Sequence, residues 1–377
     1  MTSIDADPPT RPLELPEPGA PGGGRDRRDP GRVRRADGAG TAGGSDGPPP
    51  MRFALDAWDP GYGASTTGGT EEAGGPVDAG VEIRAERWDP VDVEPAAVET
   101  VVFVDGVRRI DGRVWITDVP PPVGPFDDQP HPDEVGVLSR PGLCASVAAG
   151  AVVCRPGSAQ VVGVRVGRGL HTAAGAATDI VVPGLGVYGL YATDDDDDQA
   201  LHLSVDTHMA RLEVEVAAAV EVAEPVLTVL DGPLRGRDDA DTVGYIKTQH
   251  VQYLEGRPLG VIGRLAEGQR SPLFRIGGRF PRWSWYLRLP GPVAHPLAGV
   301  VRLELPAVGA LTEVAGAVAR ADRISGGLPR VASRPHTESR APQNLVPIAA
   351  LERQLRHRLG DPGFIERCLR ITAAAAA

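Results

Sequence analysis

The sequence predicts an α/β fold in which buried strands and helices alternate along the chain. The first indication is residues 101–104, four apolar, mostly β-branched residues typical of a buried strand, which run directly into Asp105. The second is residues 206–223, where apolar residues recur at the three- and four-residue spacing of one helix face. The third is residues 226–230, a further apolar run that leads into Asp231. Each aspartate is followed by glycine, and we expect the fold to bring the two carboxylates together.

The remaining elements follow from the same kinds of pattern. We expect the first strand to end in a turn at Asp105 and to return over residues 113–116, with further strands at 143–155 and 160–166. The helix over 206–223 has Asp206 or Thr207 available as its N-cap, and the five acids that precede it are expected to form a solvated loop. Four later segments are strand-like, namely residues 243–247, 273–276, 283–289 and 299–305. Three more are helix-like, namely residues 312–320, 345–359 (ended by Gly360) and 362–369.

Composition divides the chain into parts of different character. Residues 1–50 are rich in Pro, Gly, Asp and Arg and lack aliphatic runs, which predicts a disordered tail. Residues 51–95 are poorly defined, 96–371 form the folded domain, and 372–377 are expected to fray. The sequence shows no apolar run of roughly 18 residues and no signal-peptide core, so we expect a cytoplasmic protein. Three cysteines without Cys-x-x-Cys spacing suit a reducing compartment.

The net charge of −11 hides an uneven distribution of charge along the chain. From Arg264 to the C-terminus there are 17 arginines and 8 acids. A nucleic-acid partner is therefore compatible with this region although the whole chain is acidic. The best DNA-contact candidates lie in residues 275–288, where arginines can neutralise phosphates and aromatic rings can stack on bases. They are Arg275, Arg279, Arg282, Trp283, Trp285 and Arg288, and the alternative is a sheet with core aromatics and solvated arginines.

The order of the acidic residues suggests a chemistry. Glu213 lies at the edge of the apolar stripe of the 206–223 helix, where it has either a catalytic role or a salt bridge to a neighbour such as Arg211. Carboxylates are the ligands that Mg²⁺ and Mn²⁺ prefer, and clustered buried carboxylates repel one another without a cation. The order strand with Asp, hairpin, strand, helix with Glu, strand with Asp resembles the ribonuclease H-like fold. That resemblance implies a mixed sheet flanked by helices, here with additional β-rich elements.

A more specific resemblance rests on five segments, which are residues 103–109, 211–215, 230–234, 244–247 and 328–336. In their order and spacing they resemble the successive motifs of the NurA family of DNA end-processing nucleases, over roughly residues 97–370. The resemblance implies a catalytic and metal-binding set of Asp105, Glu213, Asp231 and His336, with Mn²⁺ or Mg²⁺ as cofactor. It also implies DNA as substrate, a homodimer with a central DNA channel, and a HerA-type hexameric ATPase as partner. Leu328 departs from the family pattern, because many relatives have a tyrosine there.

The leading hypothesis is therefore a metal-dependent deoxyribonuclease, an exonuclease or endonuclease that hydrolyses phosphodiester bonds at DNA ends in double-strand break repair. Arg108, Arg109 and Lys247 are further candidates for phosphate contacts. One alternative is a catalytically inert DNA-binding or scaffold protein of the same family, which the change at Leu328 keeps open. A glycosidase with two carboxylates is a third hypothesis, but it gives no reason for the arginine-rich C-terminal third.

Overall fold

A computed structural model of the chain describes residues 75–96, 100–118, 138–222, 226–234, 236–247 and 251–376. Contacts divide the chain into Met1–Arg52 and Phe53–Ala377, and all of the described residues belong to the second unit. The predicted tail, residues 1–50, lies outside the described residues. The segment 51–95 is described from residue 75 onward, where it contains β1 (Val77–Asp78) and the short helix η2 (Ala85–Arg87). Among the helices of the described residues, none has the length and apolar character needed to cross a membrane.

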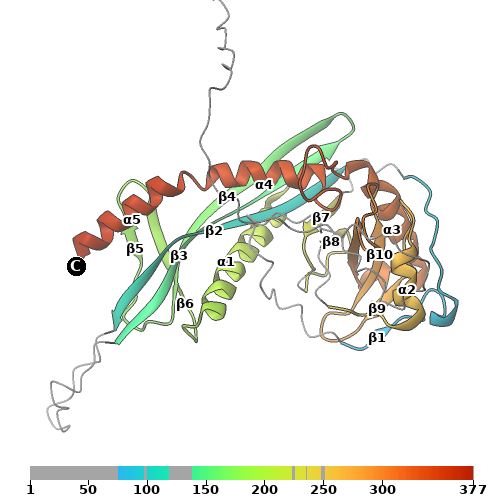
Figure 1. Ribbon diagram of the computed structural model, residues 1–377, viewed down its shortest axis with the longest axis horizontal. Helices are drawn as coiled ribbons and strands as arrows, with labels where there is room; N and C mark the ends of the chain where they lie inside the picture. The colour runs from blue at the N-terminus through green and yellow to red at the C-terminus, as the bar shows by residue number, and fades with distance from the viewer. Residues whose placement is uncertain are drawn as a thin grey trace, which may run out of the picture. The chain divides into compact units, whose positions relative to one another are not determined.

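The centre of the fold is a mixed β-sheet (Figure 1). The strands β2 (Val101–Asp118), β3 (Leu138–Arg155) and β4 (Ser158–Thr172) pair antiparallel. On the other side of β2, β7 (Leu227–Asp231) and then β8 (Thr242–Ile246) continue the sheet as parallel strands. The resulting order β4-β3-β2-β7-β8, with helices packed on both faces, confirms the predicted ribonuclease H-like mixed sheet.

Additional strands extend this sheet at both edges, and the sequence predicts those beyond β8 other than β1 but not those beyond β4. Beyond β8 lie β11 (Val300–Pro306), β10 (Arg282–Arg288), β9 (Phe274–Ile276) and finally β1. Beyond β4 lie β6 (Gly186–Ala192) and β5 (Ile180–Val182). All seven residues of β10 and all seven of β11 are buried, so this part of the sheet is covered on both faces.

The predicted turn at Asp105-Gly106 is wrong, because β2 continues through it. In the structure β2 pairs with β3 along its whole length, and Asp105 lies opposite Gly150 in the middle of the pair. The register shifts between Ile110 and Gly112, so the second Asp-Gly pair coincides with a β-bulge instead of a turn. An Asp-Gly pair allows a turn but does not impose one when a neighbouring strand pairs with both sides of it.

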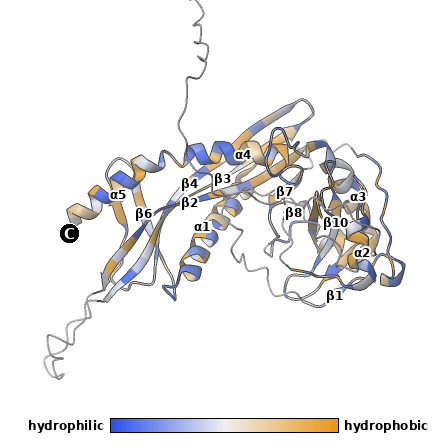
Figure 2. Cartoon of the chain, viewed as in Figure 1, coloured by the Kyte–Doolittle hydropathy of each residue, from blue (hydrophilic) through white to orange (hydrophobic). Residues whose placement is uncertain are grey.

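The helices are α1 (Asp198–Ala219), α2 (Gly256–Arg264), α3 (Val314–Gly327), α4 (Val346–Arg358) and α5 (Pro362–Ala376). The prediction for α4 is confirmed, including its end at Gly360, whose positive φ of 85° suits glycine. The helix α5 extends to Ala376, beyond the point where fraying was expected. Both apolar and hydrophilic residues occur along α1 and α4, as expected of helices with one buried face (Figure 2).

Two helices cover opposite faces of the central strands. Val102 and Val104 of β2 belong to one core cluster together with residues of α1. Phe103 and Val107 of β2 belong to the other core cluster, together with residues of α3 and α4. Because successive side chains of a strand point to opposite faces, even-numbered residues of this part of β2 face α1 and odd-numbered residues face α4. This division decides which helix meets Asp105.

The helix α1 begins earlier than predicted, because the acidic run supplies its cap. Asp197 is the N-cap residue, and its carboxylate accepts a hydrogen bond of 2.7 Å from the backbone N–H of Ala200. A carboxylate at this place satisfies a backbone N–H group that has no partner within the helix, and it interacts favourably with the helix dipole. The five consecutive acids therefore include a helix start in addition to a solvated loop.

This cap gives a test of local stability. We expect Asp197→Ala to lower the free energy of unfolding by about 1 kcal/mol, because the N–H of Ala200 loses its acceptor. The measurement is urea denaturation followed by circular dichroism at neutral pH. Asp194→Ala, which removes an acid of the same run upstream of the cap, is the matched control and should change the free energy by less than about 0.5 kcal/mol. Equal effects of the two substitutions would contradict the capping role.

Candidate metal centre

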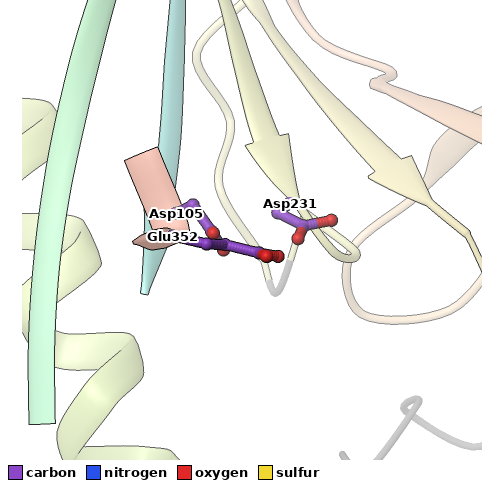
Figure 3. Close-up of side chains that lie close together, drawn as sticks. All are labelled: Asp105, Asp231 and Glu352. Carbon is purple, nitrogen blue, oxygen red and sulfur yellow. The ribbon is translucent and has the colours of Figure 1, made fainter. Parts of the chain in front are cut away.

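Parallel pairing of β2 and β7 places two carboxylates next to each other. Val104 pairs with Leu230, so the residues that follow them, Asp105 and Asp231, are neighbours across the two strands. A third carboxylate, that of Glu352, comes from α4. One oxygen from each of the three side chains lies within 4.8 Å of the other two (Figure 3). Acidic, histidine and cysteine side chains are the usual metal ligands in proteins. Among the described residues, these three form a group of such side chains close enough together to hold one metal ion.

The alternation of side chains explains why α4 supplies the third carboxylate. Asp105 follows Phe103 at a two-residue spacing, and Asp231 follows Val229 in the same way. Phe103 and Val229 both belong to the core cluster that contains α4, so the two aspartates point toward that helix. Tyr245 of β8 belongs to the same cluster, which puts the side chain of residue 247 on this face as well.

Glu213 approaches β2 from the opposite side. It is buried on α1, and a Cβ atom added to Gly106 would lie 2.7 Å from its Oε1. Because Gly106 faces α1 whereas Asp105 faces α4, the structure does not bring Glu213 into the group formed by Asp105, Asp231 and Glu352. Its charge still acts on Asp105, as the weakest of the neighbouring carboxylates that raise the pKa of that residue.

Two basic residues hold the carboxylates. Lys247 lies just after β8, and its Nζ donates hydrogen bonds to Asp231 Oδ2 at 2.6 Å and to Asn344 Oδ1 at 2.8 Å. The same Nζ is 3.7 Å from Glu352 Oε1. On the other side of Glu352, the guanidinium of Arg340 donates to Oε2. One oxygen of Asp231 and both oxygens of Glu352 are therefore paired with cations of the protein.

Burial and repulsion leave Asp105 in an unfavourable environment for a charge. Burial first, and then the charges of Asp231 and Glu352, raise the pKa of Asp105 well above its usual range, while Lys247 acts in the opposite direction. Its Oδ2 atom is buried without a hydrogen-bond partner. A buried polar atom of this kind is costly unless something binds it. Burial also raises the pKa of Tyr245, helped by Asp231, and the Tyr245 hydroxyl donates to the carbonyl of Gln343 at 2.6 Å.

The structure thus brings together Asp105 and Asp231 and adds two residues that the sequence analysis missed, Glu352 and Asn344. A signal for Glu352 was present, because it follows Ile348 by four residues and so lies on the buried face of the 345–359 helix. His336 is exposed in the segment between η4 (Leu328–Val331) and α4, and it is not part of the carboxylate group. Leu328, at the position of the family tyrosine, is buried in the core.

The aromatic part of the predicted DNA-contact stretch is core. Trp283 and Trp285 are at most 2% exposed, and their indole N–H groups donate to Leu311 O and Ser325 Oγ. Base stacking on these rings, as predicted, requires exposed faces that they do not have, because β10 is covered on both sides. Arg282 and Arg288 are also buried, bound to Glu304 and to backbone carbonyls respectively.

The other predicted contact residues have different surroundings. Arg275 and Arg279 are exposed, and their guanidinium groups lie over the rings of Trp283 and Phe280. Arg108 forms an ion pair of 2.7 Å with Asp206 of α1. Arg109 donates to Asp111 and to the carbonyls of Leu359 and Gly360, so it is bound to the end of α4. The structure therefore gives Arg108 and Arg109 partners within the protein.

The structure defines a mixed α/β protein in which two parallel strands and a helix gather three carboxylates beside a lysine. The NurA domain model matches residues 99–356, which include all three carboxylates. The chain belongs to the NurA family.

Two solved structures are similar to this one. The first is the NurA nuclease from Sulfolobus solfataricus, with 10% sequence identity and a TM-score of 0.39 over 73% of this chain and 86% of that chain. The second is endonuclease V from Bacillus subtilis, with 11% identity and a TM-score of 0.28 over 72% of this chain and 86% of that chain. A sequence search of curated proteins found no match.

The raised pKa of Asp105 gives a test that does not depend on activity. With a chelator present, we expect Asp105→Asn to raise the melting temperature at neutral pH, because it removes a buried charge that its neighbours repel. When the pKa of a carboxyl is higher in the folded protein than in the unfolded chain, the folded protein becomes less stable as pH rises above the unfolded pKa. The increase in melting temperature caused by Asp105→Asn should therefore be small near pH 4 and grow as pH rises toward the folded pKa of Asp105.

The measurement is thermal unfolding of wild type and variant between about pH 4 and 8. The matched control is Asp89→Asn, since Asp89 is exposed in a surface ion pair with Arg264, and it should give no such pH-dependent gain. An Asp105→Asn protein that is less stable than wild type at every pH would show that Asp105 is not repelled by its neighbours.

Proposed function

We propose that this protein is a divalent-metal-dependent deoxyribonuclease that hydrolyses phosphodiester bonds at DNA ends, as in the processing of double-strand breaks. The observation that carries the proposal is the buried group of Asp105, Asp231 and Glu352 within a chain of the NurA family. Three carboxylates are not gathered at a buried site by apolar packing alone, because their charges repel.

The residues present fit a hard divalent cation. All three side chains offer oxygen atoms, the donors that Mn²⁺ and Mg²⁺ favour. The buried Oδ2 of Asp105 has no hydrogen-bond partner, which is the situation of a ligand atom. Asp105, Asp231 and Glu352 would therefore hold the ion, which supplies positive charge to a phosphodiester and its attacking or leaving oxygen.

The chain's own residues would orient the DNA. Lys247 presents an ammonium group beside the carboxylates, where it can bind a phosphate oxygen. Arg275 and Arg279 are exposed cations that can neutralise backbone phosphates farther along the strand. Asn344 fixes the position of Lys247 through its side-chain oxygen. Because Lys247 Nζ donates to both Asp231 and Asn344, its ammonium group is held beside the carboxylates. A cation held in one position can orient a bound phosphate.

The family also suggests partners. A homodimer that surrounds DNA, and a HerA-type hexameric ATPase that delivers DNA to it, are proposals that rest on membership of the NurA family. Light scattering of the purified protein tests the dimer directly, and a monomer at micromolar concentration would contradict it.

The activity test uses linear DNA and Mn²⁺ or Mg²⁺. We expect wild type to cleave only when the metal is present, and Asp105→Ala to lower the rate by at least about 100-fold, because a ligand of the charge-stabilising ion is lost. Arg264→Met, which removes a cation from an exposed surface pair, is the control and should leave the rate within about twofold. A protein that binds DNA but shows no metal-dependent cleavage would instead support an inert scaffold.

A second comparison decides between the two buried glutamates. Glu352→Gln should weaken Mn²⁺ binding and cleavage about as strongly as Asp105→Asn, because its carboxylate lies within the group of three. Glu213→Gln should keep Mn²⁺ affinity within about threefold, because its side chain faces Gly106 on the other side of β2. Calorimetric titration with Mn²⁺ measures both. Loss of binding in Glu213→Gln and retention in Glu352→Gln would reverse the assignment.

A further inference from the structure

The lysine of the carboxylate centre is the only lysine in the sequence. The chain has 39 lysine and arginine residues together, and every one except Lys247 is arginine. Lys247 is largely buried, with 14% of its side chain exposed. An ammonium group is a compact point charge, whereas a guanidinium is a planar fork suited to bidentate pairing with a carboxylate. The side chain at this position therefore has the size and charge of a small cation.

Lys247 lies against two of the three carboxylates of the centre. Its Nζ donates a hydrogen bond of 2.6 Å to Asp231 Oδ2 and lies 3.7 Å from Glu352 Oε1. The other oxygen of Glu352, Oε2, accepts from Arg340. Two divalent ions about 3.5–4 Å apart would both draw their ligands from the carboxylate oxygens of one centre. Here Asp231 Oδ2 and both oxygens of Glu352 lie against cations that belong to the protein.

The charges close to the centre agree with a single ion. The carboxylates are those of Asp105, Asp231 and Glu352, with Glu213 acting on Asp105 from the other face of β2. The cations are Lys247 and Arg340. The three carboxylates of the group and the two cations leave one formal negative charge, so one divalent ion gives a net charge of +1 and a second would give +3. A second divalent ion would leave an excess of positive charge in a buried place, where like charges repel strongly.

We propose that Lys247 takes the place of a second metal ion, so that the centre holds one divalent ion per chain. This proposal rests on the proposed function. Lys247 then binds the phosphate oxygen that a second ion would otherwise contact. Asn344 is the positioning residue, since it is fully buried and accepts a hydrogen bond of 2.8 Å from Lys247.

The segment 341–348 places Asn344 beside the carboxylates, where it accepts the hydrogen bond from Lys247. The hydroxyl of Tyr245 of β8 donates a hydrogen bond to the carbonyl of Gln343 and so fixes the position of this segment. Because Tyr245 is adjacent to Asp231 in the pairing of β7 with β8, the segment is fixed directly beside that carboxylate.

The test counts ions instead of measuring activity. The full-length protein is titrated with Mn²⁺, bound metal is counted by equilibrium dialysis with elemental analysis, and electron paramagnetic resonance reports whether the ions are isolated or coupled. Wild type should bind one Mn²⁺ per chain and give the spectrum of an isolated ion. Lys247→Met releases Asp231 Oδ2 and should bind two Mn²⁺ per chain with an exchange-coupled spectrum. Lys247→Arg keeps a positive charge at the centre and should still bind one ion. Arg264→Met changes only a surface ion pair and should also bind one ion.

Each other result overturns the proposal. Two coupled ions in wild type would show that Lys247 does not exclude the second ion, and a single ion in Lys247→Met would show the same. If Lys247→Met does not fold, as judged by circular dichroism, the wild-type spectrum still decides between one ion and two. A wild-type protein that binds no Mn²⁺ contradicts the proposed nuclease as well, whereas a wild type with two ions contradicts only the role of Lys247.

Discussion

The parallel pairing of β2 with β7 is the constraint on which the rest of the centre depends. It puts Asp105 and Asp231 side by side on the face covered by α4, with Asp105 buried and the side chain of Asp231 17% exposed. Two carboxylates so placed repel each other, and positive charges from neighbouring parts of the fold offset that repulsion. The next parallel strand, β8, leads to Lys247, and the segment before α4 supplies Arg340. The surroundings of the aspartates thus follow from one backbone register.

The same strand also fixes the helix that completes the centre. Along β2, Asp105, Val107 and Arg109 follow one another at a two-residue spacing and share the face toward α4. Val107 packs in the core with α4, and Arg109 donates to the carbonyls of Leu359 and Gly360 at the end of that helix. A cation at a helix C-terminus also interacts favourably with the helix dipole. The position of Glu352 relative to Asp105 is therefore set by three neighbouring residues of one strand.

Local patterns in the sequence were sufficient for β3, β4 and the strands from β7 to β11, for the helices other than α2, and for the meeting of Asp105 with Asp231. They did not predict β5, β6 or α2, and they placed a turn within β2 where the strand continues. They were not sufficient for the third carboxylate. Glu213 and Glu352 both lie on or beside the buried face of a helix, and neither helix pattern says which one meets the aspartates. The choice depends on the face of β2 to which Asp105 points, and that face is fixed only when β2 is seen to continue past Gly106 as a strand. A turn at Gly106 would have removed the alternation on which the argument rests.

The arginine-rich C-terminal third shows a second limit of sequence patterns, which concerns charge. Several of its arginines are buried and bound to acids, among them Arg270 with Glu82 and Asp322. Arginine in such pairs contributes to a sequence count but little to the field that DNA meets, because its charge is neutralised within the protein. The exposed cations matter more, and Arg353 is one of them, with 64% of its side chain exposed and a long ion pair of 3.9 Å to Glu338. The number of arginines in this part of the sequence therefore overstates the positive charge that it presents to DNA.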